Sequence, residues 1–212
     1  MADLQEAITL YQTLLSEYAD EDPSRATYLT NLGAALKSRY DKSQDVSDLN
    51  DAIALHREAL QFTSLTSTDR VTRLDHLARV LRVRYKREYD ISDLTEAIVF
   101  RREALQLSAA TDPHVVTRFN DLGTALESRY ARRNDLPDLM EAITLYRRAI
   151  LFCLPGNPLR LIPLKNLAGA LKSRYEREEN ISDLTEALTL RREVLSAQSS
   201  QQYSQSSPPS RP

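Results

Sequence analysis

Apolar side chains recur along the chain at the spacing of one helical face. Within residues 25–40 they are separated by three, four and four positions, which places them on one side of a helix. Three later stretches repeat this pattern. The four copies are Leu29, Leu32, Leu36 and Tyr40; Leu74, Leu77, Leu81 and Tyr85; Phe119, Leu122, Leu126 and Tyr130; and Leu164, Leu167, Leu171 and Tyr175. We expect these first-type helices at residues 25–40, 70–85, 115–130 and 160–175.

A second amphipathic pattern follows each first-type helix and opens with an Asp-Leu dipeptide. The dipeptides begin at Asp3, Asp48, Asp93, Asp138 and Asp183, so each step is 45 residues. The 45-residue blocks that begin at Asp48 and Asp93 share 19 identical positions without a gap. The period therefore predicts a repeat array, in which every first-type helix pairs with a second-type helix.

Capping residues mark where these helices begin. An Asp or Asn stands before proline at three first-type helices, as Asp22-Pro23, Asp112-Pro113 and Asn157-Pro158, and Ser67-Thr68 replaces the pair once. The second-type helices follow Asp45, Asp90, Asp135 and Asn180. Pro163 interrupts the last first-type helix, which we expect to begin late or to kink near residues 159–163.

The array predicts nine helices over residues 1–197. A lone second-type helix at about residues 3–18 precedes helix pairs at about 23–62, 68–107, 113–152 and 158–196. Residues 198–212 are rich in Ser, Gln and Pro and contain almost no apolar side chain, so we expect a disordered tail.

Composition narrows the function classes. The 212 residues carry 28 Lys and Arg against 30 Asp and Glu, a net charge of −2, which gives no general attraction to nucleic acid or to anionic membranes. One Cys and three separated His argue against a metal site, and we expect no cofactor. The chain contains no apolar stretch of about 18 residues and no signal peptide, so we expect a cytoplasmic location.

The string Asn31-Leu32-Gly33-Ala34-Ala35-Leu36, followed by Ala52 and Ala59 in the next helix, resembles the tetratricopeptide repeat. The resemblance implies a right-handed superhelical, all-α solenoid that binds proteins or peptides in a concave groove lined by first-type helices. The small residue of each first-type helix is Gly33, Ala78, Gly123 or Ala168, and it allows close approach of a neighbouring helix.

The period of 45 exceeds the usual 34 by seven residues on one side of the small residue and four on the other. These insertions correspond to about two turns and one turn of helix, so both helices lengthen without rotating their packed faces. The long repeat looks like the extended arrays of fungal multidomain proteins, which accompany a caspase-like CHAT protease domain or a nucleotide-binding domain. A regulatory fragment of such a protein is therefore an alternative function.

A surface row beside the apolar one changes from repeat to repeat. We interpret it as a partner-binding groove with a mildly basic character that favours an acidic peptide, although drift of solvated positions would give the same variation. Reversing the charges of Arg79 and Arg82 is then expected to weaken binding. The candidate residues are Thr27, Thr30, Lys37, Asp75, Arg79, Arg82, Asn120, Glu127, Lys165 and Lys172.

Potential catalytic residues have structural explanations in the repeat register. His56 shares its position with Arg101 and Tyr146, and Cys153 shares its position with Thr63 and Ser108, so the repeat demands no imidazole or thiol there. The sequence therefore predicts a non-catalytic scaffold for protein–protein interaction, without an enzyme site. Self-association through uncapped terminal helices is a further possibility.

Overall fold

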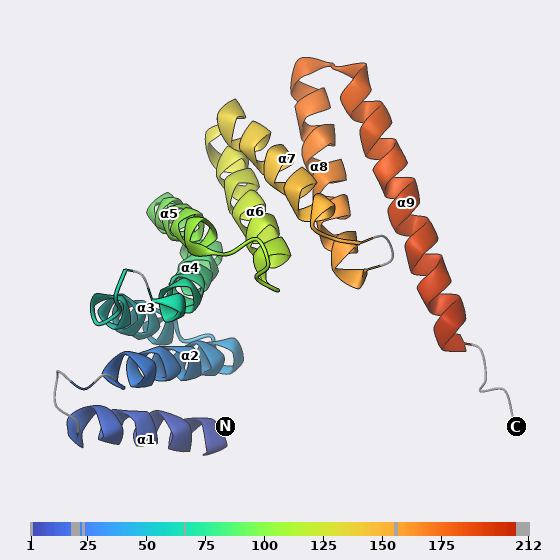
Figure 1. Ribbon diagram of the computed structural model, residues 1–212. Coiled ribbons are helices and arrows are strands. Elements are labelled where there is room, and N and C mark those ends of the chain that lie inside the picture. Colours follow the sequence, from blue (N-terminus) through green and yellow to red (C-terminus); the bar gives the residue numbers. More distant parts are fainter. Residues whose placement is uncertain (1, 18–21, 23, 66, 155–156, 207–212) are drawn as a thin grey trace, which may run out of the picture. The chain divides into compact units, whose positions relative to one another are not determined.

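A computed structural model describes residues 2–17, 22, 24–65, 67–154 and 157–206, and within these ranges the chain contains nine α-helices and no strand (Figure 1). The helices form an all-α helical repeat, as predicted. The chain divides into two compact units, Met1–Ala109 and Ala110–Pro212. Unit 1 contains α1 (Ala2–Glu17), α2 (Arg25–Ser43), α3 (Val46–Gln61), α4 (Thr68–Glu88) and α5 (Ile91–Leu107). Unit 2 contains α6 (Val115–Arg133), α7 (Leu136–Leu151), a 3₁₀ turn η1 (Pro158–Arg160), α8 (Leu161–Glu178) and α9 (Ile181–Ser206).

The apolar rows form the core of each unit. In unit 1, α2 and α4 bury Leu29, Leu36 and Leu77, and their side chains meet apolar residues of the second-type helices. Each first-type helix here packs against the second-type helix before it and the one after it, so successive hairpins share one core. In unit 2, Phe119, Leu122 and Leu126 of α6 and Leu164, Leu167 and Leu171 of α8 are buried in the same way.

Each hairpin turns through two residues, of which the first adopts the left-handed conformation. The backbone φ of Gln44 is 60°, and the equivalent residues are Tyr89, Asn134 and Glu179, with φ between 55° and 61°. Each of these residues donates its backbone N–H to the carbonyl of the tyrosine that closes the apolar row, such as Tyr40. This arrangement satisfies one carbonyl at the helix end and reverses the chain direction tightly.

A bidentate Arg–Asp ion pair closes every hairpin. The Arg before the closing tyrosine donates two nitrogens to the Asp that lies in the first turn of the second-type helix, nine residues further on. The donor–acceptor distances lie between 2.6 and 3.1 Å in the pairs Arg39–Asp48, Arg84–Asp93, Arg129–Asp138 and Arg174–Asp183. The four carboxylates are buried, whereas the arginines are partly exposed.

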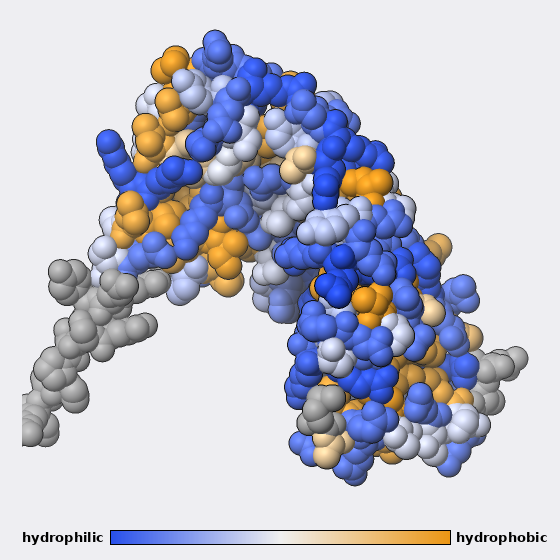
Figure 2. All heavy atoms as spheres, turned by 180° about the vertical axis from the view of Figure 1, so that it is seen from behind, coloured by the Kyte–Doolittle hydropathy of each residue, from blue (hydrophilic) through white to orange (hydrophobic). Residues whose placement is uncertain are grey.

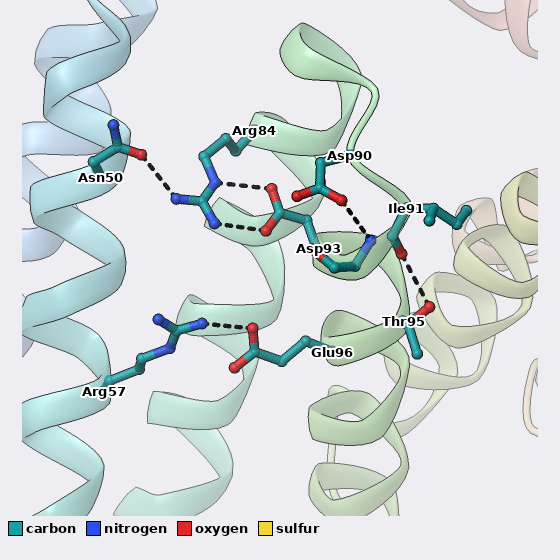
Figure 3. A network of polar contacts seen from close by, with 9 residues as sticks. Asn50, Arg57, Arg84, Asp90, Ile91, Asp93, Thr95 and Glu96 are labelled. Carbon is teal, nitrogen blue, oxygen red and sulfur yellow. Dashed lines mark hydrogen bonds and ion pairs between the residues drawn. The ribbon is translucent and has the colours of Figure 1, made fainter.

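In unit 1 the same arginines also reach the preceding second-type helix. Arg84 donates its third nitrogen, Nη1, to Asn50 Oδ1 of α3 at 2.8 Å (Figure 3). Arg39 donates in the same way to Gln5 of α1 at 3.0 Å. One guanidinium therefore holds its own hairpin together and fixes the position of the hairpin before it.

Two glycines allow a ring from the paired helix to lie directly on the helix backbone. A β-carbon built at Gly33 would lie 2.8 Å from His56 Cε1, and one at Gly123 would lie 2.6 Å from Tyr146 Cε1. Such distances are too short for ordinary contact, so a methyl group would displace the ring. The alanines at equivalent positions, Ala78 and Ala168, belong to repeats whose second-type helix has Arg101 or Arg191 in place of the ring.

The helix ends largely follow the capping pattern. The side chains of Asp45 and Asp90 accept hydrogen bonds from the backbone N–H two residues later, and Asn180 does the same, whereas Asp135 makes no such bond. The last first-type helix begins late, as predicted from Pro163. Residues 158–160 form a 3₁₀ turn, and the α-helix begins at Leu161, which places Pro163 in its first turn.

The last helix differs from the sequence-based expectation. Residues 198–212 were predicted to be disordered, but α9 continues through Ser206. Ala, Gln and Ser tolerate a helix, and residues 181–207 contain no proline, so nothing in this stretch terminates α9. Residues 207–212 lie outside the described residues. Across the described helices, none is both long and apolar enough to cross a membrane.

Replacing Arg84 with Ala should lower the free energy of unfolding by about 3 kcal/mol, because Asp93 would keep a buried charge without its partner. Chemical denaturation measures the change. Arg57→Ala is the matched control, since Arg57 pairs with Glu96 at 2.6 Å at the surface and should contribute less than about 1 kcal/mol. Equal losses in the two variants would contradict a special role of the buried pair.

Gly33→Ala should destabilise the protein by about 1–2 kcal/mol, because overpacking against His56 outweighs the higher helix propensity of Ala. Gly169→Ala is the control, since a β-carbon there meets only Glu127 Oε1 at 3.9 Å. That variant should gain up to about 1 kcal/mol. Thermal and chemical unfolding of both variants test the prediction, which fails if both substitutions stabilise the protein.

Candidate functional site

The candidate residues of unit 1 lie on the two first-type helices. Thr27, Thr30 and Lys37 belong to α2, and Asp75, Arg79 and Arg82 belong to α4. Thr27 and Arg79 are exposed, Lys37, Asp75 and Arg82 are half-buried, and Thr30 is buried. The row is therefore an accessible surface at most positions, while Thr30 serves the packing of α2 against α4.

A pocket of about 230 Å³ lies between the first halves of α2 and α4. The residues that line it all carry a polar or charged group, and they are Thr27, Thr30, Asn31, Asp69, Thr72, Arg73 and His76. Only Thr27 and Thr30 of these were among the predicted candidate residues. The pocket thus coincides with the start of the predicted row and adds to it an arginine, a histidine and a carboxylate.

Arg73 forms one wall of the pocket and is 7% exposed. It donates Nη1 to Thr63 Oγ1 at 2.9 Å, Nε to Thr30 Oγ1 at 3.3 Å and Nη2 to Thr27 Oγ1 at 3.4 Å. The nearest carboxylate, that of the exposed Asp69, lies 3.7 Å away. Hydroxyl groups thus provide most of the contacts that hold this buried cation, and they fix the threonines of the predicted row.

Two cations lie further along α4, beyond the pocket. Among the described residues, no carboxylate lies within 4 Å of the Arg79 or Arg82 guanidinium, and the buried Nε of Arg82 has no hydrogen-bond partner. Lys37 on α2 differs, since its Nζ forms an ion pair with Asp41 at 2.6 Å. The two arginines are therefore the cations of this row that remain available to an external anion.

The candidate residues of unit 2 are more engaged in internal contacts. Asn120 accepts a hydrogen bond from Asn166 Nδ2 at 2.8 Å, and Glu127 accepts one from the Tyr146 hydroxyl at 2.9 Å. Burial raises the pKa of Glu127 above its usual range and also raises the pKa of Tyr146. Lys172 pairs with Glu176 at 2.9 Å, and Lys165 is exposed. Two of the four candidates in this unit thus have structural roles.

The His56 side chain is fully buried on α3, between Gly33 of α2 and His76 of α4. The centroids of the two imidazole rings are 5.5 Å apart. Neither nitrogen of His56 has a hydrogen-bond partner. Burial, and then the neighbouring His76 and Arg79, lower the pKa of His56 to about 3, so the ring is neutral near pH 7.

Two further groups with reactive potential, Cys153 and His114, differ in their exposure. Cys153 is buried at the end of α7, and burial raises the pKa of its thiol, which disfavours the reactive thiolate. His114 is exposed beside the start of α6. Within the described ranges, no group of three or more His, Cys, Asp or Glu side chains could hold a metal ion.

Sequence reasoning missed Arg73, Asp69 and His76 because each lies outside the surface row that varies between repeats. His76 was not among the candidate residues, yet it lines the pocket. Arg73 replaces Tyr28 of the first repeat and Pro163 of the fourth, and this change of residue type was the one available signal. Its burial depends on the threonines of the neighbouring hairpin, which a single-helix pattern does not reveal.

The fold and the surface row define a helical repeat protein with a polar surface on its first-type helices. The chain matches the family model of the tetratricopeptide repeat at residues 25–63 and 164–200, and this match supports the tetratricopeptide repeat family. No curated protein matches the chain.

Solved structures share the fold. A kinesin light chain-type protein from Podosopora anserina with nearly identical TPR-like repeats has 17% identity and a TM-score of 0.71, covering 95% of this chain and 90% of that chain. BtubC from P. vanneervenii has 17% identity and a TM-score of 0.70, covering 99% and 78%. MamA has 20% identity and a TM-score of 0.59, covering 91% of both chains.

Acid should destabilise unit 1 through His56. The pKa of His56 is lower in the folded chain than the unfolded value of about 6.5, so protons bind the unfolded state preferentially as the pH falls below that value. Between pH 7 and pH 5 this single residue should remove about 2 kcal/mol of the free energy of unfolding.

His56→Tyr tests this assignment, because Tyr146 occupies the equivalent place against Gly123 in unit 2. Denaturant titrations at pH 7 and pH 5 compare this variant with the unaltered protein. The variant should lose about 2 kcal/mol less over that interval. An identical loss in both proteins would rule out His56 as the source.

Proposed function

We propose that this protein is a non-catalytic scaffold that binds an acidic peptide segment of a partner protein along the first-type helices. Helical repeat proteins of the tetratricopeptide type generally mediate protein–protein interactions, which supports the broader part of the proposal. The acidic partner follows from Arg79 and Arg82, two cations on one helix face that lack a carboxylate partner among the described residues. This observation carries the proposal.

The polar pocket beside these arginines supports recognition of an extended segment. Its threonine hydroxyls and Asn31 offer both donors and acceptors, which suit a peptide backbone or a polar side chain. A carboxylate one or two residues away along the same peptide could then reach Arg79. Planar guanidinium groups bind carboxylates with two parallel hydrogen bonds, so two adjacent arginines favour Asp or Glu over neutral residues.

The role of such an array beside a caspase-like or nucleotide-binding domain is a separate hypothesis. It rests on the likeness of the 45-residue period to fungal multidomain proteins. Full-length gene context is the observation that tests it.

Selection from a random peptide display library should enrich sequences with Asp or Glu, and Arg79→Glu/Arg82→Glu should weaken their binding at least tenfold. Fluorescence anisotropy of the selected peptides measures the affinities, and binding should weaken as salt screens the charges. Lys86→Glu/Arg87→Glu is the matched control, since it makes the same charge change on the last turn of α4, outside the row.

Circular dichroism would first establish that both double variants fold. Binding that survives reversal of Arg79 and Arg82, or that falls equally in the control, would contradict this surface as the binding site. Enrichment of neutral or basic peptides would contradict the acidic partner.

A further inference from the structure

The connection between α7 and α8 exposes apolar side chains at positions that are polar in the connection between α3 and α4. Leu151 and Leu154, at and just beyond the end of α7, are 82% and 78% exposed. Leu159 in η1 and Ile162 at the start of α8 are 48% and 55% exposed. Figure 2 shows apolar side chains at the surface of this part of unit 2. These four residues form the connection patch.

The exposure of the connection patch does not depend on where the array ends. Further hairpins follow the α3–α4 connection in the chain, yet the four counterparts there are exposed as well. A continuing array therefore leaves these positions in contact with solvent. Four apolar residues at such positions indicate a covering surface that lies outside the array. The counterparts are Gln61, Ser64, Asp69 and Thr72.

Hydrogen bonds within the connection hold the two halves of the patch together. The backbone N–H of Asn157 donates to the Leu154 carbonyl at 3.1 Å, and the Asn157 side chain accepts from the Leu159 backbone N–H at 2.9 Å. Arg160 donates Nη1 to the Ile150 carbonyl at 3.0 Å, which joins the start of α8 to the end of α7. The patch is therefore carried by one compact tip at this end of unit 2.

A cation lies one helical turn behind each half of the patch. Arg148 precedes Leu151 by three residues, and Lys165 follows Ile162 by three. Each cation therefore shares a helix face with the patch but lies further from the tip. Both cations are exposed, and within the described ranges neither forms an ion pair. Three of the four counterparts in the two preceding repeats are acidic, and the four are Glu58, Glu103, Asp75 and Asn120.

Arg148 lacks a carboxylate because this hairpin has lost an ion pair that the other hairpins form. The pair joins the start of a first-type helix to the second-type helix that follows it. Its members are Arg25–Glu58 at 3.1 Å, Arg70–Glu103 at 2.6 Å and Arg160–Glu193 at 3.3 Å. In the remaining hairpin the two positions hold Val115 and Arg148, so a carboxylate has been replaced by a cation there.

The segment that carries the patch contains no acidic residue. Residues 142–175 include six Lys and Arg and no Asp or Glu, whereas the matching residues 97–130 include four Asp and Glu. Four of the six cations pair with carboxylates of α8 or α9, which leaves Arg148 and Lys165 for an external anion. The net charge of −2 gives the whole chain no general attraction to anionic membranes, but it conceals this local excess of positive charge.

We propose that the connection patch inserts into the interface of an anionic lipid bilayer, where Arg148 and Lys165 contact the anionic groups of the lipid headgroups. Apolar side chains at the tip enter the boundary of the acyl region, and cations about 5 Å behind them stay at the level of the headgroups. The order of apolar and basic residues away from the tip is the same on α7 and on α8, which suits a flat surface that meets both helix ends.

A lipid surface also fits the shape of the patch better than a protein surface does. Leu151 and Leu154 protrude from the tip, and a fluid layer accepts protruding side chains without a complementary pocket. A two-fold contact between copies of this chain through the patch would bring the cations of both molecules together, which is unfavourable. The proposal does not involve Arg79 or Arg82, so it is independent of the acidic-peptide site.

Co-sedimentation of the full chain with phosphatidylcholine vesicles that contain about 30% phosphatidylserine tests the proposal. The bound fraction should rise saturably with lipid and fall as salt screens the charges. The affinity for vesicles of phosphatidylcholine alone should be lower by about tenfold or more.

Leu151→Gln/Leu154→Ser installs the residues of the α3–α4 connection and should weaken binding by about tenfold or more, because two apolar side chains no longer leave water. Leu65→Ser is the matched control, since Leu65 is 70% exposed on the α3–α4 connection, and binding should be unchanged. Arg148→Glu/Lys165→Glu should weaken binding to the anionic vesicles by about tenfold or more. Lys86→Glu/Arg87→Glu makes the same charge change on α4 and should alter the affinity by less than about twofold.

Circular dichroism establishes that each variant folds, and light scattering without lipid completes the test. A monomer for the unaltered protein and for Leu151→Gln/Leu154→Ser, together with the binding pattern above, supports the proposal. An oligomer that this double variant converts to a monomer would overturn it in favour of a second copy as the occupant. Absence of saturable binding at about 5 mM lipid would also overturn it, as would equal affinities for the two kinds of vesicle or equal weakening by Leu65→Ser.

Discussion

The buried Arg–Asp pair is the interaction on which every hairpin of this protein depends. It joins the end of one helix to the start of the next across a two-residue turn, and in unit 1 the same guanidinium reaches the helix before it. A buried carboxylate is costly unless it is fully paired, so the pair strongly disfavours other registers of the two helices. In the last hairpin, the Arg174 guanidinium also holds the pKa of Asp183 below its usual range. Because all four hairpins are fixed in this way, the surface of the first-type helices can vary without altering the core.

The contact between a glycine and the ring of the paired helix is a second constraint, and it acts within individual hairpins. His56 packs on the backbone at Gly33, and Tyr146 packs on the backbone at Gly123. Each ring occupies the space that a side chain at the glycine position would need. Both ring nitrogens of His56 are buried without a hydrogen-bond partner in this packing, whereas the Tyr146 hydroxyl donates a hydrogen bond to Glu127. The two hairpins therefore share a packing solution but differ in their response to acid.

The sequence allowed most of the fold to be predicted, because strict apolar spacing and a 45-residue period determine helix type and order. The late start of the last first-type helix could also be predicted, because the effect of Pro163 on a helix is local. The Arg39–Asp48 pairing was not predicted, although Asp48 was noted as the start of its Asp-Leu dipeptide. Their constant separation of nine in every repeat was the signal that could have revealed it. The helical extension of α9 to Ser206 was also missed, because low apolar content was interpreted as disorder.

The candidate site was harder to predict, because its residues depend on contacts between hairpins. Thr30 is polar and lies on the variable row, yet Arg73 of the next hairpin covers it. Glu127 has the same place in the row as Lys37 and Arg82, but Tyr146 binds its carboxylate. The sequence of one repeat gives the residue type at each position of the row. Whether that residue is exposed depends on a side chain from another helix.

The pairing of each small residue with its contact has a consequence for how such an array can change in length. Gly33 and His56 belong to one hairpin, as do Gly123 and Tyr146, and each Arg–Asp pair also lies within one hairpin. A duplicated or deleted segment of 45 residues that begins before a first-type helix would carry both members of each contact. The same length taken from the middle of a hairpin could join a glycine to an arginine, or an alanine to a ring. The whole hairpin is therefore the unit that recombination can copy without separating the members of these contacts.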